Sequence, residues 1–309
     1  MSVVAFKQVD VFTSQAFKGN PVAVIMDAST LTSEQMQAIA NWTNLSETTF
    51  VLPATDSQAD YQVRIFTPQS ELPFAGHPTI GTAYALLEAG LIKAKEGRLV
   101  QQCAAGLVTL TVNDSNHISF ELPKPKITPL DTLQTEKLAE ILKCKINTQW
   151  NAALVDVGAR WVVLQAVNAE AVLASQPDLN ALKQFSLDMK VTGSTIYGFY
   201  EESNEQKRIE VRSFAPAYGV NEDPVCGSGN GSVASFIRYH GILPAQNDVV
   251  LSSQGQALGR EGQLQLELHQ DKILVGGAAV TCIDGTITVS YTHLRAHETH
   301  YTISVGRLC

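Results

Sequence analysis

The chain has 309 residues, of which 45% are hydrophobic and 17% are charged, so it is neither a disordered nor a fibrous protein. Its 22 lysines and arginines against 30 aspartates and glutamates give a net charge of −8, without a basic run, which argues against nucleic-acid binding as its main role. Because a domain takes roughly 150 residues, this length predicts two domains. The composition and the charge predict a soluble, acidic protein.

In chain order, the first half predicts short strands with two helices among them. Strands are expected at residues 3–12, 22–26, 48–52, 61–66, 107–112 and 117–122. A helix is expected at 32–41, where Thr32 and Gln35 have the spacing of a capping box. A second helix is expected from Pro78, which suits a first turn, to Gly90, which can form a C-terminal cap.

The second half has the same mixture of elements. Helices are expected at 135–143 and at 229–241, and strands at 153–157, 161–166, 208–214, 264–268, 278–283 and 285–289. Three prolines at 123, 125 and 129, with polar neighbours, indicate a linker before this half. We therefore predict domains at 1–125 and 126–289.

The last residues, 290–309, differ from the rest of the chain. His293, His297 and His300 have helical spacing that could indicate a metal site, but the segment has no strong apolar face. It resembles the tails that arise when translation continues past a gene end. We interpret it as a non-native tail and predict no metal site.

The N-terminus and the cysteines indicate the compartment. No basic region followed by a long apolar run is present at the start, so no secretory signal is predicted. No apolar stretch approaches the ~20 residues that cross a bilayer. The 5 cysteines are widely spaced and form no CxxC pair, which disfavours a disulfide framework or structural zinc. We predict a cytoplasmic protein without membrane association.

Two segments of the chain resemble each other. Residues 63–76 read VRIFTPQSELPFAG, and residues 211–227 read VRSFAPAYGVNEDPVCG. Both fit V-R-x-F-x-P followed by E-x-P-x-x-G, and both lead into a predicted helix. Residues 9–11 and 155–157, both VDV, start the two halves at a similar offset. We infer two copies of one mixed α/β domain.

The repeat also predicts a binding site. A helix N-terminus has unpaired N–H groups and a partial positive charge, and the small residues Gly76, Gly227 and Ser228 would let a ligand approach. Two such ends related by pseudo-symmetry are expected to hold a carboxylate between the halves. The alternative is that the glycines only form tight turns. The sequence GSGNG at 227–231 is not GxGxxG, so dinucleotide binding is not predicted.

Four motifs in order resemble the phenazine-biosynthesis PhzF-like family. They are VDVFT with GNPVAV within 9–24, LSET at 45–48, FAGHPT at 74–79 and EDP at 222–224, within a resemblance that spans 3–289. The resemblance implies the diaminopimelate-epimerase-like fold of the α+β class. This fold has two pseudo-symmetric domains, each a mixed β-sheet rolled around a central helix, with the site between them. It also implies an isomerase without a cofactor that moves a proton between carbons of a small carboxylate.

The resemblance assigns roles to residues of this chain. Glu47 would be the acid/base, His77 and Asp223 would assist it, and Ser228 would contact the substrate, beside the backbone N–H groups of the two glycines. From the sequence alone, Glu47 lies between a helix and an apolar strand, where burial would raise its pKa toward working pH. The alternatives are an exposed glutamate, a packed turn histidine and a turn aspartate.

Cys226 departs from the family's pattern, in which threonine or another small residue is common. The related epimerases have a thiol here and a second in the other half, but the pseudo-symmetric residue is Ala75. Cys226 is therefore placed with the substrate-binding residues or fills core space. One alternative is an amino-acid racemase or epimerase that uses Glu47 and Cys226, and another is a non-catalytic carboxylate-binding protein. A homodimer is compatible with such folds, although no residue demands it.

Overall fold

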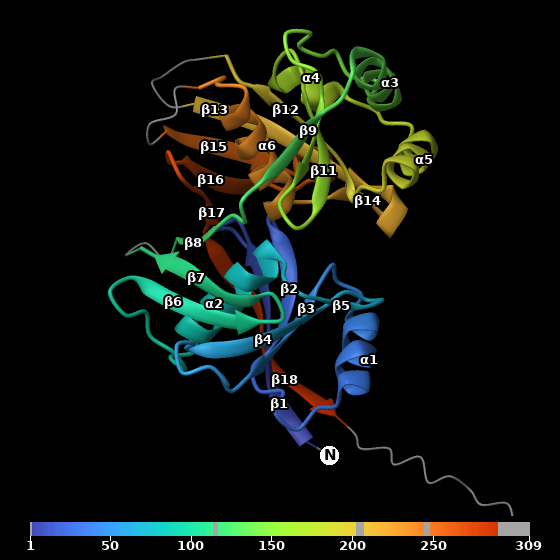
Figure 1. Ribbon diagram of the computed structural model, residues 1–309. Helices are drawn as coiled ribbons and strands as arrows, with labels where there is room; N and C mark the ends of the chain where they lie inside the picture. The colour runs from blue at the N-terminus through green and yellow to red at the C-terminus, as the bar shows by residue number, and fades with distance from the viewer. Residues whose placement is uncertain (1, 114–116, 202–206, 244–247, 290–309) are drawn as a thin grey trace, which may run out of the picture.

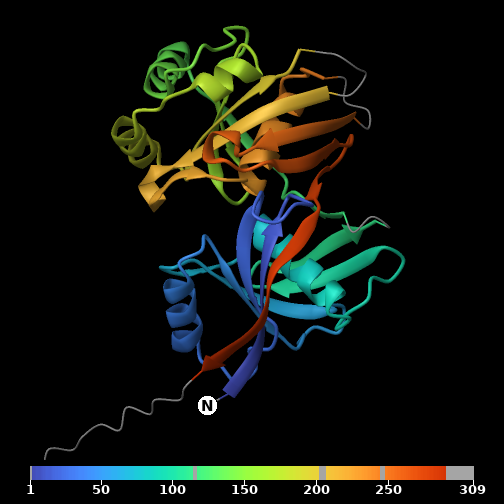
Figure 2. The same ribbon diagram turned by 180° about the vertical axis from the view of Figure 1, so that it is seen from behind.

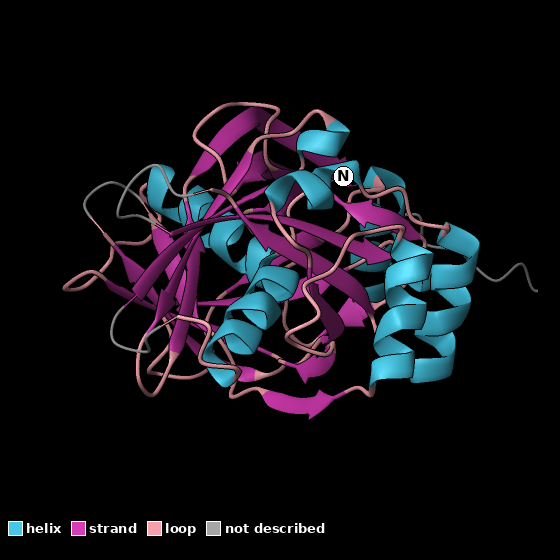
Figure 3. Cartoon of the chain, turned by 90° about the horizontal axis from the view of Figure 1, so that it is seen from above, coloured by secondary structure: helices cyan, strands magenta, loops and turns pink. Residues whose placement is uncertain are grey.

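The computed structural model describes residues 2–113, 117–201, 207–243 and 248–289 (Figure 1). The molecule has two lobes, one above the other, and a helix runs through the strands of each lobe. These two helices are α2 (Gly76–Glu88) and α6 (Gly227–Tyr239). Seen from above, further helices lie outside the strands (Figure 3). The predicted tail and its three histidines lie outside the described residues.

The remaining elements follow in chain order. In the first half they are β1 (Ser2–Val11), β2 (Asn20–Ile25), α1 (Ser33–Thr43), β3 (Thr48–Leu52), β4 (Tyr61–Phe66), β5 (Glu71–Leu72), β6 (Arg98–Cys103), β7 (Gly106–Val112) and β8 (Ile118–Glu121). In the second half they are β9 (Lys126–Pro129), α3 (Thr132–Leu142), β10 (Ala153–Asp156), β11 (Arg160–Gln165), α4 (Ala169–Ala174), α5 (Leu179–Met189), β12 (Gly193–Phe199), β13 (Lys207–Ala215), β14 (Val220–Asp223), β15 (Asp248–Gln254), β16 (Gly262–Leu268), β17 (Ile273–Gly277) and β18 (Ala279–Val289).

The strand pairing repeats between the halves. β1 pairs antiparallel with β2, β2 parallel with β3, β3 antiparallel with β4, and β4 parallel with β6. The same directions recur for β10 with β11, β11 with β12, β12 with β13, and β13 with β15. An antiparallel meander, β6–β7–β8 or β15–β16–β17, completes each half. The predicted α+β class with two pseudo-symmetric halves is confirmed.

Among the described strands, two pairings join the halves. β8 pairs with β17, and β18 pairs with β1 along its whole length, from Ser2 opposite Val289 to Val11 opposite Ala279. From behind, β18 runs down from the upper lobe along the lower one (Figure 2). The prediction assigned residues 278–289 to the second half, whereas the structure places this strand beside the first strand of the first half. The division at residues 125 and 126 stays a prediction, and β18 crosses it.

The helix ends follow the predicted local signals. Thr32 caps α1, because its side chain accepts a bond from the Gln35 nitrogen and its own nitrogen donates to Gln35 Oε1. Both central helices begin two residues earlier than predicted. Gly90 and Gly241 follow their ends with φ of 69° and 60°, a conformation that costs glycine little. Among the described residues, no helix has both the length and the apolar character of a membrane span.

Several elements were not predicted. They are the helices α4 and α5 and the strands β5, β6, β9, β12, β14, β15 and β17. Strand β12 contains Gly193 and Gly198, which weaken the strand pattern. A side chain at these positions would collide with the backbone oxygens of Phe214 and Asn168, so close backbone packing explains both glycines. Helix α4 has only six residues, too few for a clear helical period.

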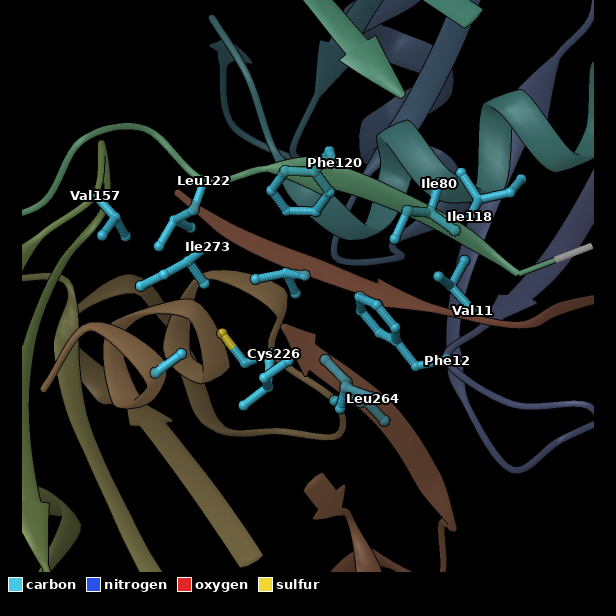
Figure 4. Packing of buried hydrophobic residues seen from close by; sticks show 14 of the residues in the cluster. Val11, Phe12, Ile80, Ile118, Phe120, Leu122, Val157, Cys226, Leu264 and Ile273 are labelled. Carbon is cyan, nitrogen blue, oxygen red and sulfur yellow. The ribbon is translucent and has the colours of Figure 1, made fainter. Parts of the chain in front are cut away.

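The largest hydrophobic core is continuous across both halves. It includes residues of α2, such as Ile80, and residues of α6, such as Phe236. Figure 4 shows Phe12, from the end of β1, among side chains of both halves such as Leu264. Two smaller cores lie elsewhere, one beneath α3, α4 and α5 and one beneath α1. The shared core positions the two central helices relative to each other.

Candidate active site

The N-termini of α2 and α6 face each other between the halves. A side chain carbon built on Gly227 would lie 3.6 Å from the backbone nitrogen of His77 and 3.3 Å from the ring of Phe12. Neither helix has an acidic residue in its first turn, and Ala75, at the N-cap of α2, offers no side-chain cap. The two positive helix ends therefore meet in one place, where an anion would be stabilised from both sides.

Glu47 directly precedes β3 and lies against the first turn of α2. Its Oε2 atom is 3.4 Å from Nδ1 of His77, and the two side chains are 16% and 7% exposed. Burial, together with the charge of Asp223, raises the pKa of Glu47 to about 8. Burial lowers the pKa of His77 to about 3. Near pH 7 the imidazole is therefore neutral, and Glu47 exchanges readily between its two protonation states.

Three buried polar atoms near this contact have no hydrogen-bond partner. They are Glu47 Oε2, His77 Nε2 and Asn20 Oδ1. Buried polar side-chain atoms are paired in most proteins, because an unpaired one loses its bonds to water without replacement. Unsatisfied atoms on three neighbouring elements therefore indicate a place where a bound molecule would supply the missing partners.

Asp223, at the end of β14, carries the second acidic group. Its Oδ1 accepts hydrogen bonds from Asn20 Nδ2 at 3.0 Å and from the Val225 nitrogen at 3.1 Å. Burial raises the pKa of Asp223 to about 6, although the Cys226 thiol and the Val225 nitrogen favour its ionised form. The structure thus brings Asp223 of the second half into electrostatic contact with Glu47 of the first half.

Cys226 is the N-cap of α6. Its Sγ accepts a hydrogen bond from the Gly229 nitrogen at 3.2 Å, and it lies 3.6 Å from Ser228 Oγ. Burial raises the pKa of the thiol well above its usual value, so the thiol is neutral at physiological pH. A neutral thiol is a poor base, which weakens the racemase alternative that uses Cys226.

Ser228 lies in the first turn of α6 beside Trp161 of β11. The indole Nε1 donates to Ser228 Oγ at 3.0 Å. An indole N–H can only donate, so the oxygen of Ser228 is the acceptor, and its own O–H can donate either to Cys226 Sγ or to a bound molecule. Ser228 is partly exposed, and its hydroxyl can therefore donate to a bound carboxylate.

Gly76 has a structural reason of its own. A side chain at this position would contact the ring of Phe120 at 2.5 Å, which is too close for any other residue. Tight packing therefore accounts for Gly76 without a ligand, as the tight-turn alternative expected. Gly227 is different, because its nearest neighbours lie at 3.3 Å and beyond.

The repeated V-R-x-F motif forms the same ion pair in both halves. Arg64 pairs with Glu71 through bonds of 2.7 and 2.6 Å, and Arg212 pairs with Glu222 through bonds of 2.9 and 2.8 Å. Each pair connects two neighbouring strands just before the segment that enters a central helix. Glu222 directly precedes Asp223, so the second pair also holds Asp223 in place. The motif therefore stabilises the fold, and it supports the site only through the position of Asp223.

Sequence reasoning missed two residues of this cluster. Asn20 belongs to the GNPVAV motif, which was used only for the resemblance, and its contact with Asp223 depends on the folding of both halves. Trp161 had no signal beyond its place in a predicted strand. Among the described residues, no group of three or more His, Cys, Asp or Glu side chains is arranged to hold a metal ion.

Comparisons with known proteins show the family of this chain. The family model described as "Phenazine biosynthesis-like protein" matches residues 9–285. The chain belongs to this family. It is 41% identical over 293 residues to Antisense-enhancing sequence 1 of Schizosaccharomyces pombe, covering 91% of this chain and 97% of that protein. It is 34% identical over 295 residues to trans-2,3-dihydro-3-hydroxyanthranilate isomerase of Pseudomonas fluorescens, covering 91% and 98%.

A solved structure of this family has the same fold. The Bacillus anthracis phenazine biosynthesis protein of the PhzF family superposes with a TM-score of 0.81 at 26% identity, covering 94% of this chain and all 100% of that chain. The predicted PhzF-like membership and diaminopimelate-epimerase-like fold are confirmed. The predicted enzyme class, an isomerase, is also confirmed by the named relatives. The site residues, the cytoplasmic location, the homodimer and the absence of a cofactor stay predictions.

Proposed function

We propose that this protein is a cofactor-independent isomerase that moves a proton between two carbons of a small carboxylate, with Glu47 as the acid/base. The observation that carries the proposal is the environment of Glu47. Its carboxyl is buried beside an uncharged histidine, has an unpartnered oxygen and has a pKa raised to about 8. A proton shuttle works best when its pKa lies close to the working pH, since both of its forms are then populated.

The proposed reaction begins with the substrate carboxylate between the two helix ends. Ionised Glu47 takes a proton from a carbon near that carboxylate, and the electron pair of the broken C–H bond moves into the conjugated system. The developing negative charge is stabilised by the N–H groups at the starts of α2 and α6 and by the Ser228 hydroxyl. Glu47 then returns its proton to a second carbon, so that no atom or electron is gained or lost.

His77 and Asp223 have supporting roles in this proposal. Because the imidazole of His77 is neutral, it can form a hydrogen bond to the substrate without adding a charge that would hold Glu47 ionised. Asp223 can accept a hydrogen bond from an amino or hydroxyl group of the substrate. Its negative charge also raises the pKa of Glu47, so the second half helps to set the basicity of the first.

The substrate is proposed to combine a carboxylate with a neighbouring hydrogen-bond donor. The relative from Pseudomonas fluorescens is named for trans-2,3-dihydro-3-hydroxyanthranilate, a ring compound with a carboxylate, an amino group and a hydroxyl group. The positive helix ends, with the Asp223 carboxyl beside the start of α6, suit such a pattern of groups. We therefore take this compound as the first probe within a wider panel of amino and hydroxy carboxylates.

Proton exchange in D₂O, followed by NMR, tests the proposal. With wild-type protein we expect deuterium to appear on carbon in at least one compound of the panel. The variant Glu47→Gln should lower the exchange rate by about 1,000-fold or more, because it removes the only group that carries the proton. The exposed Glu136 of α3 provides the matched control, and Glu136→Gln should exchange at the wild-type rate.

The same experiment separates the alternatives. Inversion at a single stereocentre, together with loss of exchange in Cys226→Ser, would favour the racemase. Ligand-induced stabilisation without any exchange, unchanged by Glu47→Gln, would favour the non-catalytic binding protein and contradict the role of Glu47.

A further inference from the structure

Asn20 forms a direct polar connection between the acidic groups of the two halves. It is the first residue of β2 and is completely buried, with 0% exposure. Its Nδ2 donates to Asp223 Oδ1 at 3.0 Å and to the Val225 carbonyl at 2.9 Å. Both amide hydrogens of this first-half residue are therefore used by the segment of the second half that enters α6.

The contact distinguishes the two oxygens of Asp223. Oδ1 accepts from Asn20 and from the Val225 nitrogen, so it is surrounded by donors. A hydroxyl oxygen is a weaker acceptor than a carbonyl-type oxygen, and a proton on Oδ1 would face these donors. When Asp223 is neutral, its proton therefore belongs on Oδ2.

Asn20 and Glu47 are also placed by neighbouring strands of the sheet. β2 pairs parallel with β3, with Ala23 opposite Thr48, and Thr48 directly follows Glu47. Asn20 and Glu47 thus lie at the same end of neighbouring strands. The other titratable groups around the two carboxyls are His77 on α2, Cys226 on α6 and Glu222 on β14.

We propose that Asn20 is a positioning residue with two effects. It fixes the distance between the carboxyls of Asp223 and Glu47, and it determines which oxygen of Asp223 carries a proton. The inference rests on the function proposed above, because that function requires the carboxyls of Glu47 and Asp223 to act on the same substrate. The amide suits this role for a physical reason. It holds Asp223 with a donor but adds no charge beside Glu47, whereas a lysine or an arginine would keep both acids ionised.

Two substitutions with opposite electrostatic effects test the proposal. Asn20→Asp keeps the side chain's shape, removes the donor and adds a negative charge near Glu47. Asn20→Ser shortens the side chain so that its hydroxyl no longer reaches Asp223, adds no charge and releases Asp223 from its position. The titration midpoint of Glu47, followed by ¹³C NMR of labelled glutamate and assigned with Glu47→Gln, should rise by about half a pH unit or more in the first variant and fall in the second.

Activity provides a second reading, with trans-2,3-dihydro-3-hydroxyanthranilate as the probe. We expect each Asn20 variant to lower kcat about 10- to 100-fold and to change KM less than about threefold, because the helix ends that hold the carboxylate are retained. The control is Asn41→Asp, which makes the same chemical change at an exposed residue of α1 and should leave midpoint and rate unchanged.

The outcomes separate this inference from the proposed function. Unchanged Glu47 midpoints in both folded Asn20 variants would overturn the role of Asn20, even if Glu47→Gln abolishes turnover. Absence of exchange in wild-type protein would instead contradict the proposed function, while the titration would still decide whether Asn20 couples the two carboxyls. If Asn20→Asp does not fold, the direction in which Asn20→Ser shifts the titration midpoint of Glu47 decides alone. If Asn20 had only a structural role, Asn20→Ser would lower the thermal stability and leave that midpoint unchanged.

Discussion

Glu47 and His77 share one buried environment, which shifts their pKa values in opposite directions. Burial disfavours the charged form of each group, so it raises the pKa of the carboxyl and lowers that of the imidazole. Their 3.4 Å contact is therefore a contact between groups that are mostly neutral near pH 7, rather than a strong ion pair. Glu47 can therefore change its protonation state near neutral pH while His77 stays neutral beside it.

This environment predicts how stability depends on pH. The pKa of Glu47 is raised in the folded protein, so its contribution to stability is complete below its ordinary value of 4.5 and is lost as the pH rises through about 8. The pKa of His77 is lowered, so its contribution is present above 6.5 and is lost as the pH falls toward about 3.

We therefore expect Glu47→Gln to stabilise the protein relative to wild type at pH 9 by about 2 kcal/mol more than at pH 5. Urea unfolding at the two pH values measures this difference. The variant Glu136→Gln should show no such dependence, and an equal effect of Glu47→Gln at both pH values would show that Glu47 ionises freely in the folded state.

At the scale of secondary-structure elements, the two Arg–Glu pairs occupy equivalent positions with unequal burial. Arg212 and Glu222 are 8% and 10% exposed, whereas Arg64 and Glu71 are 25% and 35% exposed. Arg212 also donates to the carbonyls of Val172 and Ser175 at the end of α4. The second pair thus joins β13, β14 and α4, and it lies next to Asp223.

The difference in burial predicts unequal costs for the same substitution. Arg212→Lys should lower the free energy of unfolding by about 3 kcal/mol, because lysine cannot form the two parallel bonds and leaves a buried carboxylate poorly paired. Arg64→Lys should cost about 1 kcal/mol or less, since water can replace the lost bonds. Chemical denaturation measures both values, and equal costs would contradict the argument from burial.

At the scale of the whole molecule, β18 ties the end of the second half to the first. It covers one edge of β1, and Lys7 of β1 connects it to the end of α2. The Lys7 Nζ atom donates to Glu88 and to Asp284 at 2.8 Å each, and this side chain is 9% exposed. Burial alone would lower the pKa of Lys7, but the two carboxylates raise it, so the ammonium stays charged.

We expect Lys7→Ala to lower the free energy of unfolding by about 2 kcal/mol, because it leaves two carboxylates without their shared cation and removes packing between β1 and β18. Thermal unfolding measures the loss. Lys95→Ala is the matched control, since Lys95 also pairs with a carboxylate, Asp60, but is 83% exposed and should cost less than about 0.5 kcal/mol.

Much of the fold followed from local patterns, and the exceptions share a cause. Strands such as β3 and β4 were predicted with their observed ends, because short runs rich in β-branched and aromatic residues are typical of strands. Strand β12 was missed because its glycines serve contacts with segments far away in the sequence. The crossing of β18 to β1 was missed because a strand's pattern shows that one face is buried but does not name its partner.

The sequence by itself determined the repeat, the fold class, the capped helices and, through the family motifs, which side chains were candidates for the site. Only the tertiary structure decided that the starts of α2 and α6 face each other, that Glu47 lies beside a neutral His77, and that Asn20 holds Asp223 across the two halves. The reason is physical. Periodicity and capping depend on neighbours along the chain, whereas a pKa and a hydrogen bond between halves depend on which distant groups exclude water from the same place.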